Sequence, residues 1–151
     1  MYFWNIDKLT QELMEGSLSE NESFKYLIAS TIVYGIVTIP FFEHNMLDTS
    51  SAIIGGVINI VGAFYIFQCN RGGNGKSLLQ RYISIGWVVC IRWLALIVLP
   101  TFIIYYAFLE ISFEIPDETT IQEVLLSNIV LIAYFWSFGK HIKLVANSDN
   151  A

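Results

Sequence analysis

The chain has 151 residues, of which 55% are hydrophobic and only 14% are charged. A soluble domain carries about 25% charged residues, so this chain lacks the polar side chains that would cover a globule in water, and its composition argues against a soluble enzyme. Its net charge of −5 argues against a nucleic-acid partner, because phosphate groups are bound by basic surfaces. The composition therefore predicts an integral membrane protein that forms one domain over 1–151.

A transmembrane helix needs about 20 apolar residues to cross the roughly 30 Å hydrocarbon core of a bilayer. Four segments approach this length, at about 24–42, 50–68, 82–109 and 121–139. They are expected to be helices, because every backbone polar group in lipid needs a partner within the protein. The chain is therefore predicted to be all-α, with four transmembrane helices joined by short loops into a bundle.

The segment before the first span contains Ile6, Leu9 and Leu13 at helical spacing, followed by Met14. This pattern predicts a short amphipathic helix on the cytoplasmic side of the membrane, ending near Gly16. Residues 1–23 hold five acidic side chains and no apolar run, which argues against a cleaved signal peptide.

Two pairs of residues have the spacing of a capping box, in which a hydroxyl and a Glu three residues later bind the free amides at a helix start. Ser19 and Glu22 are placed to begin the first membrane helix. Thr120 and Glu123 are placed to begin the fourth.

The basic residues predict how the spans are oriented. Seven of the eight lie on one side of the membrane, and the eighth, Arg92, lies inside the third span. Loops rich in Lys and Arg stay in the cytoplasm, so both chain termini are expected there. The residues on that side are Lys8, Lys25, Arg71, Lys76, Arg81, Lys140 and Lys143.

Arg92 lies about 5 Å from the middle of 82–109, on the cytoplasmic side. A charge at this depth costs at least ~2.5–3.5 kcal/mol, so it is expected to face the other helices. The polar side chains of matching depth, which complete a candidate intramembrane polar site, are Asn59, Tyr34 and Tyr134. The alternative is that the membrane part begins at Trp93, with Arg92 reaching the lipid phosphates and 78–91 lying along or beneath the interface.

Pro100 also lies inside the third span. It cannot donate a hydrogen bond to the carbonyl of Leu96, and this loss can kink a helix. Either a static kink or a hinge is compatible with this position.

Small residues recur every four positions along the second predicted span. They form a candidate helix-packing stripe of Ser51, Gly55, Asn59 and Ala63. Small side chains let two helix backbones approach closely, and Asn59 offers a hydrogen bond between helices. The stripe is expected either to pack against another helix of this chain or to form a homodimer face.

The loop 70–77 is rich in glycine and carries positive charge. Its last residues, Gly75, Lys76 and Ser77, match the end of a phosphate-binding P-loop, but Asn70 stands where that motif begins with glycine, and a membrane helix replaces the preceding strand. No nucleotide is therefore expected. The basic residues are instead candidate contacts for anionic lipid headgroups, and they are Arg71, Lys76 and Arg81.

No set of residues in the sequence has the spacing of a catalytic or metal site. Cys69, Cys90, His44 and His141 are scattered along the chain, and Arg92 is the ionisable residue that lies clearly within a span. The chain is accordingly expected to be no enzyme and to hold no metal ion or cofactor.

Two stretches of the chain carry a family resemblance. The first is Leu9-x-x-Glu12-Leu13-x-x-Gly16-x-Leu18-Ser19-Glu20 with Tyr26-Leu27-x-Ala29, and the second is Cys69-Asn70-x-Gly72-Gly73-x-Gly75-x-x-Leu78-x-x-Arg81-Tyr82 with Trp87-Val88-Val89-x-Ile91-Arg92. Together they resemble small bacterial four-span membrane proteins of unassigned function. The resemblance implies a bacterial inner-membrane location and a unit formed by the glycine-rich loop, Arg81 and Arg92, and it implies no activity.

A well-specified bundle without visible chemistry indicates a non-enzymatic, multi-pass inner-membrane protein that acts through protein–protein interaction in the membrane. A subunit of a membrane complex and an immunity-like protein have this size, by fold-level analogy. The alternative is a homo-oligomeric small channel or transporter that uses Arg92 and Asn59. The expected partners are membrane lipids and either another protein or further copies of the chain, without nucleic acid.

Overall fold

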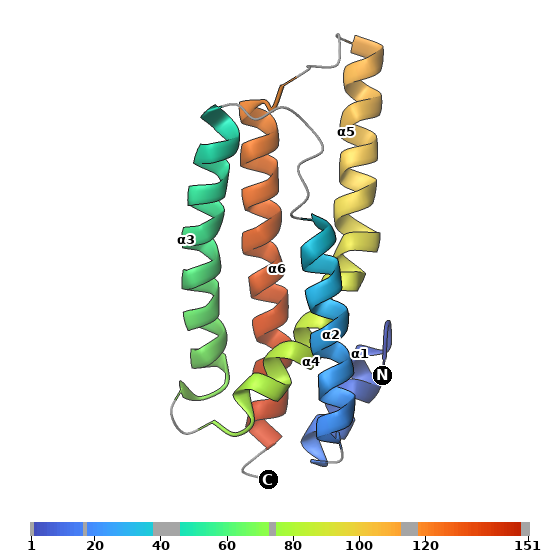
Figure 1. Cartoon of the computed structure of the whole chain (residues 1–151), viewed down its shortest axis with the longest axis vertical. Helices are drawn as coiled ribbons and strands as arrows, with labels where there is room; N and C mark the ends of the chain where they lie inside the picture. The colour runs from blue at the N-terminus through green and yellow to red at the C-terminus, as the bar shows by residue number, and fades with distance from the viewer. Residues whose placement is uncertain (1, 17, 38–45, 73–74, 113–117, 149–151) are drawn as a thin grey trace.

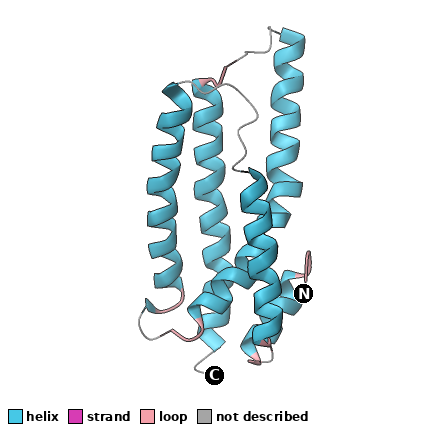
Figure 2. Cartoon of the chain, viewed as in Figure 1, coloured by secondary structure: helices cyan, strands magenta, loops and turns pink. Residues whose placement is uncertain are grey.

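The computed structural model describes the chain except for residues 1, 17, 38–45, 73–74, 113–117 and 149–151. The described part is built from helices, and no strand occurs in it (Figure 2). The helices are α1 (Ile6–Met14), α2 (Glu20–Val37), α3 (Met46–Cys69), α4 (Leu78–Trp93), a π-helical turn (Leu94–Val98), α5 (Leu99–Ser112) and α6 (Ile121–Ser148).

The helices are arranged around a long contact between α3 and α6, which lie side by side (Figure 1). α4 runs obliquely across α6 and also contacts α1 and α2. α5 continues upward from α4, and α1 and the last turns of α6 lie toward the opposite end of the molecule from the top of α5. We call the end that holds α1 and the last turns of α6 the base.

Three helical runs in the described part are long and apolar enough to cross a membrane: Met46–Cys69, Leu78–Ile111 and Ile121–Ser148. These runs coincide with the predicted spans 50–68, 82–109 and 121–139, and they fit an integral membrane protein. The predicted span 24–42 is not confirmed, because α2 is not among these runs and residues 38–42 lie outside the described part.

α1 occupies the segment in which a short helix is predicted. Asn5 caps it by accepting a hydrogen bond from the Lys8 amide (3.0 Å), and the left-handed backbone of Gly16 (φ +67°) follows its end. Its buried side chains include Ile6, Leu9 and Leu13, and they face α4 and α6.

Hydrogen bonds connect Tyr2 to α1 and α2, and they connect the segment between α1 and α2 to α4. The Tyr2 amide donates to the Tyr26 hydroxyl, and the Tyr2 hydroxyl donates to the Glu12 carboxylate, both at 2.6 Å. The negative charge that accepts this bond raises the pKa of Tyr2 above its ordinary value. The amide of Gln80 on α4 donates to the Leu18 carbonyl and ties the α1–α2 connection to α4 (2.8 Å).

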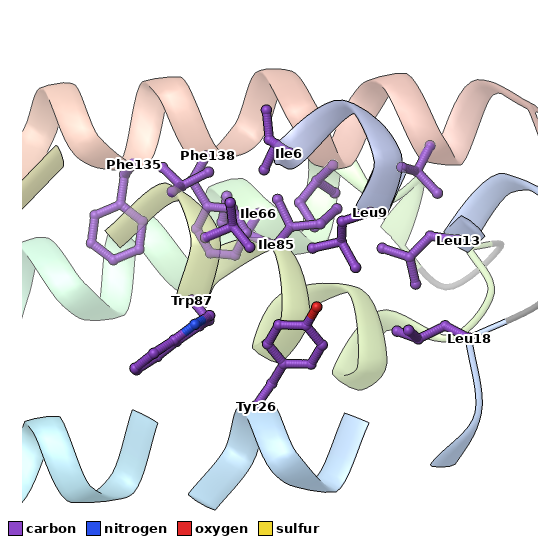
Figure 3. Close-up of a cluster of buried hydrophobic side chains, with 14 residues drawn as sticks. Ile6, Leu9, Leu13, Leu18, Tyr26, Ile66, Ile85, Trp87, Phe135 and Phe138 are labelled. Atoms are coloured by element: carbon purple, nitrogen blue, oxygen red, sulfur yellow. The ribbon is translucent and has the colours of Figure 1, made fainter. Parts of the chain in front are cut away.

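Most of the buried hydrophobic side chains form one cluster at the base, which we call the basal core (Figure 3). α5 contributes none of its members. They are Ile6, Leu9, Leu13, Leu18, Tyr26, Ile66, Ile85, Trp87, Val88, Val89, Phe135, Phe138, Ile142 and Val145. The cluster shows that α4, although it is apolar enough to belong to a membrane span, is surrounded by protein along much of its length.

The junction between α4 and α5 is irregular because of Pro100. The π-helical turn lies directly before it, and the Leu99 amide reaches back five residues to the carbonyl of Leu94. A proline ring clashes with the carbonyl four residues earlier and removes one hydrogen bond, and a wider turn relieves this clash. The irregularity that the sequence predicts near Pro100 is therefore a π-helical turn in the structure.

Two glycines allow α3 and α6 to pack closely. A Cβ atom added to Gly62 on α3 would lie 2.6 Å from the ring of Phe135 on α6. A Cβ atom on Gly139 of α6 would collide with the ring of Tyr65 on α3. Each helix therefore places an aromatic ring on a glycine of the other, so that side chains larger than hydrogen do not fit at these two positions.

The start of α6 carries the predicted capping box. The Thr120 amide donates to the Glu123 carboxylate (2.8 Å), and the Glu123 amide donates to the Thr120 hydroxyl (3.4 Å). The same carboxylate accepts a hydrogen bond from Tyr106 of α5 (2.6 Å). At Ser19, the hydroxyl accepts a hydrogen bond from the Glu22 amide (3.3 Å), which is one half of the box predicted there.

Candidate functional site

The face of α3 that packs on α6 differs from the stripe predicted at every fourth residue. The partly or fully buried positions along this face are Ser51, Gly55, Ile58, Gly62, Ile66 and Cys69, and Leu47, Asp48 and Phe67 of α3 are partly buried as well. The six positions from Ser51 to Cys69 on this face are separated by steps of three or four residues, which follow one face of a helix with 3.6 residues per turn. A strict step of four drifts around the helix by 40° each time, so Asn59 and Ala63 fall outside the packed face and are exposed.

The exposed members belong to a second row of small residues, which we call the lateral stripe. It consists of Ala52, Gly56, Asn59 and Ala63. All four are exposed, and a Cβ atom added to Gly56 would meet no atom within 4 Å. The lateral stripe is therefore a smooth surface beside the α3–α6 contact, with no side chain of the described part covering Gly56.

Asn59 lies near the middle of α3, within the lateral stripe. Its side-chain amide donates to the carbonyl of Gly55 in its own helix (2.8 Å). No hydrogen bond to its side-chain oxygen occurs in the described part of the chain. The arrangement leaves a strong acceptor pointing outward from a helix that is apolar enough to span a membrane.

The structure does not bring Arg92 and Asn59 together. Arg92 is on α4 at the base, where its guanidinium carbon lies 5.8 Å from the ring centre of Trp4. The hydroxyl of Tyr134 donates to the Gly86 carbonyl (3.3 Å) instead of contacting Arg92. The side chain of Tyr34 lies outside the described part.

Arg92 stands where the buried part of the long helix gives way to its exposed part. The residues before it, such as Val88 and Val89, belong to the basal core, whereas Leu94 and Leu96 after it are exposed. This change in burial is compatible with the alternative interpretation of the sequence, in which the membrane part of the helix begins at Trp93. The depth of Arg92 in a bilayer stays a prediction.

The glycine-rich loop is held by a buried pair of polar side chains. Arg81 is 3% exposed and donates to the side-chain oxygen of Asn70 (3.0 Å), which is itself fully buried. The amide of Asn70 donates to the Lys76 carbonyl (3.3 Å), and Gly75 packs so closely on Asn70 that a Cβ atom there would collide with its backbone oxygen.

The three candidate lipid contacts differ in how accessible their side chains are. Arg81 is buried and positions the loop, so its side chain is not presented to a lipid surface. Lys76 is exposed and Arg71 is partly exposed. The unit that the resemblance suggests therefore joins Asn70 to Arg81, and Arg92 contacts a different part of the chain.

Several residues that surround Arg92 in the structure are not predicted to lie near it from the sequence. A cavity of about 230 Å³ beside it is lined by side chains that include Ser137 and His141 of α6. These two are one helical turn apart, and that spacing was the available signal. The position of Trp4 against Arg92 depends on the packing of α1, for which the sequence offers no local pattern.

No three His, Cys, Asp or Glu side chains gather in a way that could hold a metal ion, within the part of the chain that the structure describes. Both cysteines are free thiols. Comparisons with protein-family models, with curated proteins and with solved structures gave no match to this chain. The candidate sites therefore depend on the geometry of the chain itself.

Proposed function

We propose that this chain is a non-enzymatic membrane protein that acts by binding another protein within the membrane, as a subunit of a membrane complex or as an immunity-like protein. The observation that carries this proposal is the outward-facing Asn59 in the middle of α3. The side-chain oxygen of Asn59 needs a donor that lipid tails do not offer, because apolar chains form no hydrogen bonds. A neighbouring transmembrane helix satisfies that need.

The residues around Asn59 support the same proposal. Gly56 and Ala63 flank it one turn away on either side, and both are exposed. Helices associate in membranes through such small residues, because close backbone approach increases van der Waals contact and shortens the path for a hydrogen bond. The partner is therefore another transmembrane helix, supplied by a second copy of the chain or by a different protein.

The topology that accompanies this proposal has four spans with both termini in the cytoplasm of a bacterium. The three long apolar helices support the membrane location, and the clustering of basic residues supports the orientation. In this arrangement the base lies on the cytoplasmic side, and the lateral stripe faces the lipid.

The test compares two neighbouring substitutions that add the same side chain to α3. Gly56→Leu fills the lateral stripe, whereas Val57→Leu changes an exposed residue that points away from it. Both fit the isolated chain, because Gly56 has open space around it and Val57 is 56% exposed. Each variant is extracted gently from its native membrane, and the intact complex is weighed by native mass spectrometry.

We expect the wild-type chain and Val57→Leu to retain the same companion, and Gly56→Leu to appear without it. A companion of different mass identifies a membrane complex, and a multiple of the chain mass identifies self-association. A wild-type chain that is always extracted alone, or a Gly56→Leu variant that keeps its companion, would overturn the proposal. Ion flux through the purified chain alone would favour the channel alternative instead.

A further inference from the structure

The cavity beside Arg92 combines a charged lower wall with an apolar upper wall. It lies at the junction of α4, the π-helical turn and α6, and its volume is about 230 Å³. The lining residues are Val89, Arg92, Trp93, Leu96, Ile97, Ser137 and His141. Leu96 and Ile97 are 58% and 40% exposed, so the apolar wall continues onto the outer surface of the helix.

The polar groups of this cavity have unused hydrogen-bonding capacity. The Nε atom of Arg92 is buried and has no hydrogen-bond partner. Among the described residues, no carboxylate pairs with the Arg92 guanidinium, and its recorded contact is with the face of Trp4. A buried donor of this kind costs about 1–3 kcal/mol when it stays unsatisfied, so a ligand that accepts a hydrogen bond there gains affinity.

Arg92 is the charged residue among those that line the cavity. The charged groups that act on His141 are Arg92, Lys140 and Asp7, which are two cations and one carboxylate. An anion is therefore the complementary ligand for the lower wall. The upper wall, made of Leu96 and Ile97, is complementary to a hydrocarbon chain.

One tryptophan lines the cavity, and two others lie against cations near it. Trp93 is among the lining residues. The ring centre of Trp4 lies 5.8 Å from the guanidinium carbon of Arg92, and the ring centre of Trp136 lies 3.3 Å from the Lys140 ammonium. Tryptophan gathers at the boundary between lipid headgroups and lipid tails, where its ring is apolar and its N–H is hydrated. The cavity is therefore placed where headgroup phosphates and the first carbons of acyl chains meet.

We propose that this cavity binds one anionic phospholipid. Its phosphate accepts hydrogen bonds from Arg92 and Ser137, and an acyl chain lies along Leu96 and Ile97. The site differs from the cations of the glycine-rich loop, where Arg81 is already engaged by Asn70. It is also independent of the lateral stripe, since Gly56 and Asn59 take no part in it.

The test measures lipid retention by the full chain in detergent, using native mass spectrometry during titration with phosphatidylglycerol. Phosphatidylcholine with the same acyl chains is the control lipid, and inorganic phosphate is the control for a free anion. We expect one phosphatidylglycerol to be retained well below the concentration at which phosphatidylcholine binds. Arg92→Gln is expected to weaken this retention about tenfold, because a hydrogen bond between charged groups is lost.

Two further variants complete the test. Arg71→Gln removes a partly exposed cation of the loop and is expected to leave retention unchanged. Ser137→Leu fills the cavity from α6 while Arg92 stays in place, and it is expected to abolish retention even if Arg92→Gln does not fold. Equal binding of the two lipids, competition by millimolar phosphate, or unchanged retention in both cavity variants would overturn the proposal.

Discussion

The base and the upper half of the molecule both contain apolar helices, but these helices are buried by protein to different extents. In the base, Ile85 and Val88 of α4 are fully buried by protein. In the upper half, Ile103 and Ile104 of α5 are 67% and 69% exposed. The folded core of this chain is therefore concentrated where α1, α4 and α6 meet, and the outward surfaces of α3 and α5 are left for lipid or for a partner.

The largest effect is expected from removing a side chain of the basal core. Ile85→Ala should lower the free energy of unfolding by about 2–5 kcal/mol, because it leaves a cavity in a packed interior. Ile104→Ala, the same change on α5, should alter it by no more than about 0.5 kcal/mol. Denaturant unfolding in one detergent measures both, and equal losses would contradict the contrast between the two regions.

The second largest loss of stability is expected from breaking the buried Asn70–Arg81 pair, which holds the glycine-rich loop. Asn70→Ala removes the acceptor of Arg81 and the donor to the Lys76 carbonyl, so a loss of about 1.5–3 kcal/mol in unfolding free energy is expected. Gln68→Ala nearby changes an exposed side chain and serves as the control. A wild-type unfolding midpoint in the Asn70 variant would show that the buried pair does not stabilise the loop.

Two glycines of α3 allow the comparison to be made within one helix. Gly62→Ala should destabilise the chain by about 1–3 kcal/mol, because its methyl group meets the Phe135 ring. Gly56→Ala should stabilise the isolated chain by about 0.5–1 kcal/mol, because alanine favours a helix and the space around it is open. Opposite shifts in melting temperature in detergent are the expected result, and shifts of the same sign would refute this packing arrangement.

A small effect is expected at the contact between α5 and the start of α6. Tyr106→Phe removes the hydrogen bond to Glu123 and should cost about 0.5–1 kcal/mol, because the side chain is exposed. Hydrogen exchange should report the change as faster exchange at the end of α5, with α4 unaffected. Loss of protection throughout α4 would mean that the two regions unfold as one unit.

Local patterns in the sequence account for several features of the fold. The spacing of Ile6, Leu9 and Leu13 predicts the face of α1 that the structure buries, and Thr120 with Glu123 predicts the start of α6. These signals depend on neighbours within one helical turn. They are therefore readable without knowledge of the tertiary structure.

The candidate sites were less predictable because they depend on contacts between distant segments. Hydropathy alone does not distinguish a helix buried in protein from one buried in lipid, so the sequence leaves open whether the membrane part of 82–109 begins before or after Arg92. The packing of α4 in the basal core is visible only in the folded chain. The contact of Arg92 with Trp4 requires the packing of α1 against α4. The stripe predicted from steps of four included Asn59 and Ala63, which the structure turns away from α6.

We propose that another protein binds at the lateral stripe of α3. A photo-crosslinking amino acid placed at Ala63 in the intact membrane tests it directly, with the same group at Val61, which is 62% exposed on another side of α3, as the control. We predict one discrete protein adduct from position 63 and none from position 61. Adducts from neither position, or the same adducts from both, would contradict the claim.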